Sequence, residues 1–272
     1  MGIAVLYSTQ YVNLARKVKT LLTSYGLEVT SFTNLEKPIT LPSETEVVLI
    51  IGGDGTVLRA IHYVKALEET LLLPLGTGKL NFLSEYTVYE AEEAIAKVMK
   101  HDYTLEEYPL IAVYVEGTKV KFINDIVIKP EIPRPMIRVT AYIPDVDHAN
   151  YLVYRNRADG VLLSSTLGST AYLLSTGGPI IDPELKAIVF KLLNPHTPVA
   201  NVPYVLPVNK KLRVDLTCEH RMLAIVDGIQ QISLSTETHL ELCGVDSYIK
   251  FIRFHRRGES FYDKVFRRLH TP

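Results

Sequence analysis

Apolar and polar positions divide the first hundred residues into alternating strands and helices. Apolar runs predict strands at 3–7, 27–32, 47–51 and 71–75, and helically spaced apolar residues predict helices at 11–25, 57–67 and 88–100. The run at 47–51 shows no polar alternation, which is typical of a parallel strand buried on both faces. Strands that alternate with helices predict a parallel sheet covered on both faces.

The pattern changes near residue 100, where short apolar runs rich in β-branched residues replace the helices. These runs predict strands at 111–115, 120–128, 137–143, 151–154, 161–163, 211–216, 222–226, 232–235 and 248–254. Glycine, proline and aspartate turns separate them, which indicates a mostly antiparallel arrangement. The sequence therefore predicts an α/β plus all-β protein, with an α/β domain at 1–100 and a β-rich domain at 101–254.

Two further helices are predicted in the second half of the chain. One interrupts the strands near Pro183–Leu193, and the other spans Glu259–Leu269. The last helix is basic and contains Lys264, Arg267 and Arg268. A solvated helix face or a subunit contact is the favoured interpretation of these charges, and a phosphate-binding clamp is the alternative.

Composition and charge narrow the functional classes. The chain has 272 residues, of which 47% are apolar and 22% are charged, and its net charge is −1. This near-neutral charge predicts no general affinity for nucleic acid or membranes, and the apolar runs are too short for a transmembrane helix. The N-terminus enters a strand directly, without a signal peptide, and Cys218 and Cys243 are expected to be reduced. We therefore expect a cytoplasmic protein.

The segment Gly52-Gly53-Asp54-Gly55-Thr56 lies between the strand at 47–51 and the next helix. Open α/β sheets bind ligands at this position, where the free amides of a helix N-terminus favour phosphate. Glycine lets a polyphosphate approach the backbone, while the Asp54 carboxylate suits work on a hydroxyl group or a metal ion. The alternative is a tight turn in which Asp54 or Thr56 caps the helix. The spacing fits neither a Walker A loop nor a dinucleotide fingerprint.

A second segment, residues 157–179, is rich in hydroxyl groups and glycine, and it contains Arg157, Asp159 and Tyr172. Hydroxyl and backbone groups can bind the edge of a base or a ribose, and a tyrosine ring can stack on a base. Asp159 could accept a hydrogen bond from a ribose hydroxyl or an amine. A Ser/Thr-rich loop without a ligand is the alternative.

A third signal is the pair Asn124-Asp125, two polar residues inside an apolar strand. Strand alternation places them on opposite faces, and a satisfied buried pair or a bend at the strand edge would explain them equally well. The eight histidines form no His-x-x-x-His pair with an adjacent acid, so the sequence predicts no zinc site.

Taken in order, these segments resemble the motifs of the NAD kinase family, which phosphorylates the adenosine 2′-hydroxyl of NAD to give NADP. The family pattern is Gly-Gly-Asp-Gly, Asn-Glu, Asp-Gly, a Gly-Ser-Thr-Ala-Tyr run and Gly-Gly-Pro. The matching segments here are 52–56, 124–125, 159–160, 168–172 and 177–179, and 195–197 matches a family Pro-His-Thr. The resemblance covers most of the chain. The chain departs from the family pattern at three places. Asp125 stands where the family has glutamate, the proline usual before the glycine run at 168 is missing, and Ile229 interrupts a late Asp-Gly-Gln motif.

The resemblance implies a phosphofructokinase-like N-terminal domain with the C-terminal helix (255–272) packed on it, an all-β C-terminal domain, and an active site in the crevice between them. It also implies a homodimer or homotetramer. Asp54 corresponds to the catalytic acid–base. The implied substrate- and nucleotide-binding residues are Gly53, Gly55, Thr56, Arg59, Phe82, Asn124, Asp125, Arg157, Asp159, Thr170, Ala171, Tyr172, Ser175 and Gln230. In the family, an arginine at the position of Arg157 accompanies a preference for NAD over NADH.

The implied reaction transfers a phosphoryl group to NAD from ATP or inorganic polyphosphate. Phosphoryl transfer needs an aligned hydroxyl and neutralised phosphate charge. Asp54 would accept the hydroxyl proton, while the amides of Gly52–Gly55 and the side chain of Arg59 would hold the phosphates. Mg²⁺ would arrive with the nucleotide, so no metal-ligating residue is assigned.

Two rival functions share parts of this pattern. Diacylglycerol and sphingosine kinases have a Gly-Gly-Asp-Gly loop and a related two-domain plan, but the polar segment 164–176 argues against a lipid pocket. A non-catalytic sensor of NAD or NADP would use the hydroxyl-rich segment and would not need Asp54.

Overall fold

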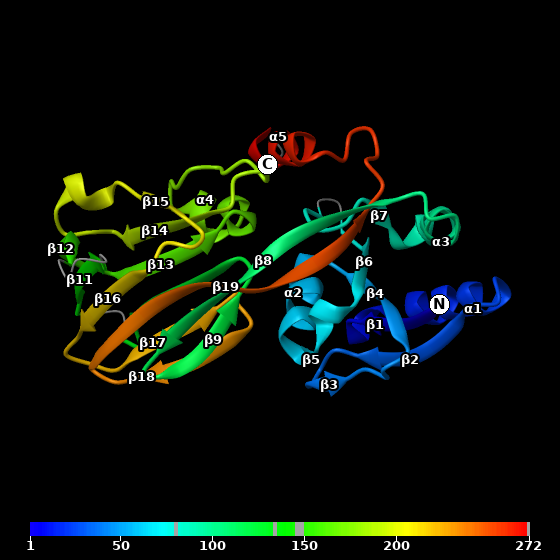
Figure 1. The fold of residues 1–272 in the computed structure, drawn as a ribbon, viewed down its shortest axis with the longest axis horizontal. Coiled ribbons are helices and arrows are strands. Elements are labelled where there is room, and N and C mark those ends of the chain that lie inside the picture. Colours follow the sequence, from blue (N-terminus) through cyan, green and yellow to red (C-terminus); the bar gives the residue numbers. More distant parts are fainter. Residues whose placement is uncertain (79–80, 133–134, 145–149, 271–272) are drawn as a thin grey trace. The chain divides into compact units, whose positions relative to one another are not determined.

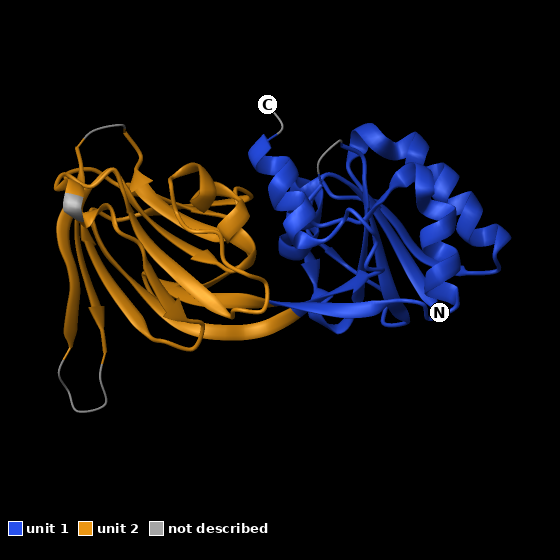
Figure 2. Ribbon diagram, turned by 90° about the horizontal axis from the view of Figure 1, so that it is seen from above, with its two compact units in different colours: residues 1–108, 249–272 blue, residues 109–248 orange. Residues whose placement is uncertain are grey.

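The computed structural model describes residues 1–78, 81–132, 135–144 and 150–270, and Figure 1 shows the course of the chain. Two compact units are distinguished by their internal contacts (Figure 2). Unit 1 comprises residues 1–108 and 249–272, and unit 2 comprises residues 109–248. The chain passes between the units within β8 (Thr104–Val115) and β19 (Glu237–Arg253). The domain limits at 1–100 and 101–254 stay predictions.

Unit 1 is built on a parallel sheet in the order β6-β4-β1-β2. Its strands are β1 (Gly2–Tyr7), β2 (Glu28–Asn34), β4 (Thr45–Gly52) and β6 (Leu71–Gly76). The end of β19 pairs with β6 in parallel, and the short strands are β3 (Ile39–Thr40), β5 (Val64–Lys65) and β7 (Tyr86–Thr87). The parallel direction predicted from the apolar run at 47–51 is therefore confirmed.

The helices of unit 1 are α1 (Val12–Ser24), α2 (Asp54–Tyr63), α3 (Ala91–Met99) and α5 (Phe261–His270). Helices α1 and α3 share one hydrophobic cluster with Val5, Leu49 and Ile51 of the sheet. Residues of the opposite alternation, such as Val48 and Ile50, are also fully buried, so both faces of the sheet are covered. None of the described helices is long and apolar enough to span a membrane.

Unit 2 contains two antiparallel sheets. One has the order β12-β11-β16-β19, with β8 and β9 paired beside β19, and the other has the order β15-β14-β13-β10-β17-β18. Their further strands are β9 (Thr118–Phe122), β10 (Asp125–Pro130), β11 (Ile137–Ile143), β12 (Tyr151–Ala158), β13 (Gly160–Ser165), β14 (Ala187–Leu193), β15 (Tyr204–Pro207), β16 (Leu212–Thr217), β17 (Met222–Val226) and β18 (Gln230–Leu234). A short helix, α4 (Tyr172–Ser175), follows β13.

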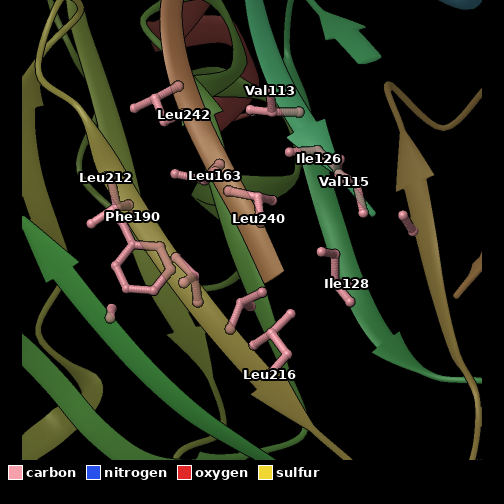
Figure 3. Close-up of a cluster of buried hydrophobic side chains, with 14 of the residues drawn as sticks. Val113, Val115, Ile126, Ile128, Leu163, Phe190, Leu212, Leu216, Leu240 and Leu242 are labelled. Carbon is pink, nitrogen blue, oxygen red and sulfur yellow. The ribbon is translucent and has the colours of Figure 1, made fainter. Parts of the chain in front are cut away.

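A hydrophobic core joins the two sheets of unit 2 (Figure 3). Val113, Leu212 and Leu240 reach it from one sheet, and Ile126 and Phe190 reach it from the other. Inward side chains alternate with more exposed ones along β11 and β16, the period-2 pattern of a half-buried strand. The predicted β-rich domain is thus a two-layered antiparallel structure.

Three secondary-structure predictions were wrong. The single strand expected at 120–128 is broken by a bend at residues 123–124 into β9 and β10. The helix expected near Pro183–Leu193 is the strand β14, because its Ile-Val-Phe core pairs with β13 and β15 and its short apolar run does not distinguish a buried strand from a helix. The helix expected to reach residue 67 ends at Tyr63, since Val64 starts β5 and Ala66 has a left-handed backbone. Short 3₁₀ helices occur at Thr9–Tyr11, Leu67–Glu69, Val88–Glu90, Leu167–Thr170 and Pro198–Asn201.

The basic face predicted for the last helix divides into two parts. Arg268 is exposed, while Arg267 is partly buried and pairs with Glu259. Lys264, in contrast, is only 4% exposed and points into unit 1. The interpretation of these charges as a solvated helix face or a subunit contact therefore does not hold for Lys264, whose side chain is buried within unit 1.

Candidate active site

Asp54 occupies the first turn of α2, directly after the carboxyl end of β4. Gly53 is the N-cap residue, and no side chain caps this helix. The Asp54 carboxylate instead accepts two backbone hydrogen bonds, from the amide of Phe82 to Oδ2 at 2.9 Å and from the amide of Leu83 to Oδ1 at 3.0 Å. The structure therefore does not support the alternative in which Asp54 caps the helix.

The glycines of this loop leave its backbone open. Among the described residues, a Cβ added at Gly55 would meet no atom within 4 Å, and one at Gly53 would meet only Asn81 Oδ1 at 4.0 Å. Thr56 packs its side chain against Gly52, and Arg59 lies partly exposed one turn further along α2. The start of α2 thus has open space at two glycines of a helix N-terminus, with Arg59 on the same helix, and this arrangement suits a phosphate group.

Asn124 lies at a bend between β9 and β10, which answers the question left open by its place in an apolar segment. Three successive amides there, those of Ile123, Asn124 and Asp125, donate to the carboxylate of Asp227 at 2.9, 2.7 and 2.9 Å. Sequence reasoning missed Asp227. The available signal was the Asp-Gly pair between two apolar runs, which predicts a tight hairpin turn.

The bend leaves one polar atom of Asn124 without a partner. Its Oδ1 is buried and accepts no hydrogen bond among the described residues. Buried acceptors are normally paired, so this unpaired oxygen is an exception among the described residues. The backbone of Asn124 is also closely approached, because its carbonyl oxygen accepts from the amide of Ser165 at 2.8 Å and would lie 2.1 Å from a Cβ at Gly168. The second and third sequence motifs therefore meet.

Asp125 is buried beside Asp227. Burial, and then the negative charge of Asp227, raise the pKa of the Asp125 carboxyl to about 7. Near neutral pH this carboxyl is therefore divided between its protonated and ionised forms. In the protonated form it can donate a hydrogen bond as well as accept one.

The hydroxyl-rich segment serves two purposes. Ser165, Thr166 and Ser169 are buried and bond to backbone groups of neighbouring strands and loops. These residues fit the Ser/Thr-rich loop that was the alternative interpretation. Tyr172, in contrast, is 46% exposed at the start of α4, and Ser175 is exposed at its end. Between residues 164 and 176, the side chains of Tyr172 and Ser175 are therefore open to a ligand, while Ser165, Thr166 and Ser169 are not.

The structure does not bring all the other predicted residues of unit 2 to this region. Asp159 precedes β13 at the end opposite Ser165, the residue that bonds to Asn124, and Arg157 lies two residues further back on β12. Thr170 is buried, with its hydroxyl donating to Leu167 O at 3.3 Å, and Ala171 is half-buried. Asp159 is exposed and accepts from the Asn194 side chain at 3.1 Å. Arg157 is exposed on β12, and Gln230 starts β18 with its backbone paired to Val226. In unit 1, Phe82 is half-buried.

Within the part of the chain that the structure describes, no three His, Cys, Asp or Glu side chains are grouped so that they could hold a metal ion. Among these residues, Asp54 therefore belongs to no group of three that could form a metal site of the protein's own. A divalent ion at this site would be bound chiefly by the phosphates of a nucleotide, as is usual for Mg²⁺.

Comparison with protein families identifies both halves of the chain. Residues 6–103 match the ATP-NAD kinase N-terminal domain, and residues 123–254 match the ATP-NAD kinase C-terminal domain. The chain belongs to the NAD kinase family. An NAD kinase from Thermococcus sibiricus is 34% identical over 217 residues, which cover 79% of this chain and 75% of that protein.

Two solved structures of NAD and NADH kinases share the fold. An NAD kinase from Archaeoglobus fulgidus in complex with ATP has a TM-score of 0.77 at 22% identity, over 98% of this chain and 99% of that one. Yeast NADH kinase complexed with NADH has a TM-score of 0.82 at 20% identity, over 98% and 86%. The predictions of an NAD kinase, with an α/β domain and a β-rich domain, are confirmed.

Proposed function

We propose that this protein transfers the γ-phosphoryl group of ATP to the 2′-hydroxyl of the adenosine ribose of NAD, which yields NADP and ADP. The observation that carries the proposal is the Asp54 carboxylate at an open, glycine-lined helix N-terminus, in a chain of the NAD kinase family. The ATP complex of the Archaeoglobus fulgidus kinase supports ATP as the donor. Inorganic polyphosphate stays an untested alternative donor.

Asp54 acts as the general base. A carboxylate has about four lone-pair positions, and the amides of Phe82 and Leu83 use two of them. A remaining position accepts the proton of the 2′-hydroxyl as that oxygen attacks the γ-phosphorus. The bond between the γ-phosphorus and its bridging oxygen breaks, and ADP leaves.

The phosphates of the donor lie at the start of α2. The amides near Gly53 and Gly55 and the guanidinium of Arg59 provide positive charge there, as transfer of a phosphoryl group requires. Mg²⁺ enters as part of the MgATP substrate and neutralises phosphate charge. Thr56 continues the same turn.

NAD is bound by unit 2. The unpartnered Asn124 Oδ1 and the carboxyl of Asp125 face donors of the nucleoside, and Tyr172 stacks on its base. Thr170, Ala171, Ser175, Asp159, Arg157 and Gln230 complete the proposed dinucleotide-binding set. The preference for NAD over NADH that accompanies Arg157 in the family stays a prediction.

The direct test incubates the purified chain with NAD and MgATP and measures NADP with an NADP-specific dehydrogenase. Parallel reactions replace ATP with polyphosphate, NAD with NADH, and NAD with diacylglycerol or sphingosine. We expect NADP from NAD and no phosphorylated lipid. Dinucleotide binding without NADP formation from either donor would instead identify a sensor, and phosphorylation of the lipid alone would identify a lipid kinase.

Location and assembly belong to the same proposal. The two cysteines form no disulfide, in keeping with the cytoplasm. The family resemblance implies a homodimer or homotetramer. Light scattering of the purified protein would measure this oligomeric state. Both stay predictions.

A further inference from the structure

Lys264 of α5 donates hydrogen bonds to the turn that holds Asp54. Its Nζ lies 3.0 Å from the carbonyl oxygen of Phe82 and 2.9 Å from that of Ser84. The carbonyl of Phe82 and the amide of Leu83 belong to the same peptide group, and that amide donates to Asp54 Oδ1. A single peptide group therefore links the ammonium of Lys264 to the carboxylate of Asp54.

This linkage affects the carboxylate in two ways. A cation at the carbonyl oxygen polarises the peptide group, so its amide becomes a stronger donor. The bond from Lys264 also fixes the orientation of this peptide plane, so the Leu83 amide holds Asp54 Oδ1 in place, while the amide of Phe82, in the preceding peptide group, holds Oδ2. A general base needs this fixed direction, because a displacement of about 1 Å can lower a rate about 100-fold.

The burial of Lys264 shows that its amine is not a surface charge. The residue is 4% exposed, and burial followed by the charge of Arg253 lowers its pKa to about 8. Glu259, Glu85 and Asp54 act in the opposite direction and raise this pKa. A buried amine costs stability unless hydrogen bonds satisfy it, and here the two carbonyls of the turn do so.

We propose that Lys264 is a positioning residue for phosphoryl transfer, which orients the Asp54 carboxylate through the peptide group shared by Phe82 and Leu83. The inference rests on the proposed function, in which Asp54 is the general base. Lys264 itself touches neither the substrate nor the reacting atoms in this role.

Arg256 offers a matched control on the same turn. Its Nη1 donates to the carbonyl oxygen of Glu85 at 3.0 Å, and its Nη2 donates to Glu90 at 2.8 Å. The amide of the peptide group that it holds belongs to Tyr86, which lies beyond the two amides that face Asp54. Arg256→Gln therefore removes a cation from the turn without releasing those two amides.

The experiment compares Lys264→Met, Lys264→Gln and Arg256→Gln in the full chain, with folding checked by circular dichroism and thermal melting. For Lys264→Met we expect kcat to fall about 10- to 100-fold, with KM for NAD and MgATP within about threefold, since a positioning effect acts on the transition state. Lys264→Gln keeps an amide donor and is expected to lie between Lys264→Met and wild type. If Lys264→Met does not fold, Lys264→Gln takes its place in the comparison. Arg256→Gln should keep kcat within about threefold.

A double-mutant cycle tests whether Lys264 acts through Asp54. In the Asp54→Asn background, Lys264→Met should lower the residual kcat by less than about threefold, because coupled residues are not additive. An equal fractional loss in both backgrounds would overturn the proposal. So would folded Lys264 variants whose kcat matches that of Arg256→Gln. Failure of the proposed function looks different, because the wild-type chain itself would then form no NADP.

Discussion

Asp125 and Asp227 are joined by two hydrogen bonds that run in opposite directions. The amide of Asp125 donates to Asp227 Oδ1 at 2.9 Å, and the amide of Asp227 donates to the carbonyl oxygen of Asp125 at 2.8 Å. Asp227 has a left-handed backbone, with φ of 50°, in the turn between β17 and β18. This turn brings a second carboxyl close to the buried side chain of Asp125, and a pH dependence follows.

We expect Asp125 to make the folded state less stable as the pH rises from about 4 to 7. Its pKa is raised from 3.8 to about 7 by folding, so over this range the unfolded chain releases a proton that the folded chain retains. At about 1.4 kcal/mol per pKa unit, the free energy of unfolding falls by roughly 4 kcal/mol. Urea unfolding of the wild type and of Asp125→Asn across this pH range measures this contribution, as the difference between their free energies of unfolding.

Asp246 is the control for this measurement. Lys119 and Lys121 lower its pKa, so its stabilising contribution is complete above about pH 4 and is lost only as the pH falls further. The difference between the wild type and Asp246→Asn should therefore stay constant between about pH 5 and 7. If the difference in unfolding free energy between the wild type and Asp125→Asn were also constant over this pH range, the raised pKa of Asp125 would be contradicted.

Asp54→Asn should lower kcat by about 10²–10⁴, the range of general acid–base catalysis, and leave dinucleotide affinity within a few fold. Asparagine cannot accept both amide hydrogen bonds, because its NH₂ group would face either Phe82 or Leu83. We therefore also expect a loss of about 1 kcal/mol in stability. Steady-state kinetics and thermal melting measure the two effects.

Near-wild-type turnover in a folded Asp54→Asn protein would reject the catalytic role. A folded variant that loses dinucleotide binding together with turnover would point to a positioning role instead. The pH and Mg²⁺ dependence of the residual rate then separates proton acceptance from an effect on the bound MgATP.

Gly55→Ala should change the nucleotide kinetics, whereas Gly168→Ala should lower the stability of the fold. A methyl group at Gly55 meets no atom of the described residues within 4 Å, so the melting temperature should be unchanged. KM for MgATP should rise, since the methyl fills space beside the amides proposed to bind the phosphates. A methyl group at Gly168 would lie 2.1 Å from the Asn124 carbonyl oxygen, so that variant should lose stability. Unchanged nucleotide kinetics in Gly55→Ala would remove this loop from the phosphate site.

Tyr172→Ala should weaken NAD binding by about 1–3 kcal/mol, the contribution of stacking between a base and an aromatic ring. Because Tyr172 is 46% exposed, its loss should barely change the melting temperature. Isothermal titration calorimetry with NAD measures the effect, and Tyr151→Ala, an exposed tyrosine of β12, is the matched control. Equal affinities for NAD in both variants would show that Tyr172 does not stack on the base.

Local patterns of burial were sufficient for much of unit 1. The strands β1, β4 and β6 follow from unbroken apolar runs, because a strand covered on both faces is apolar throughout. The helices α1 and α3 follow from apolar residues at helical spacing, because each buries one face. The Gly-Gly-Asp-Gly segment was placed correctly because it stands between the apolar run of β4 and the helically spaced apolar residues of α2. The sequence order of the motifs was enough to predict the NAD kinase family.

Contacts between residues distant in sequence decided the rest. The apolar run of β14 fits a helix or a strand, and only its pairing with β13 and β15 selects the strand. Asp227 holds the Asn124 bend from more than a hundred residues away, and Lys264 supports the Phe82–Ser84 turn from the last helix. A single charged side chain forms no repeating pattern in the sequence, so its hydrogen-bond partner depends on which distant segment the tertiary structure brings beside it. The sequence thus determined which groups are available for phosphoryl transfer, while the tertiary structure decided how Asp54, Asn124 and Lys264 are held.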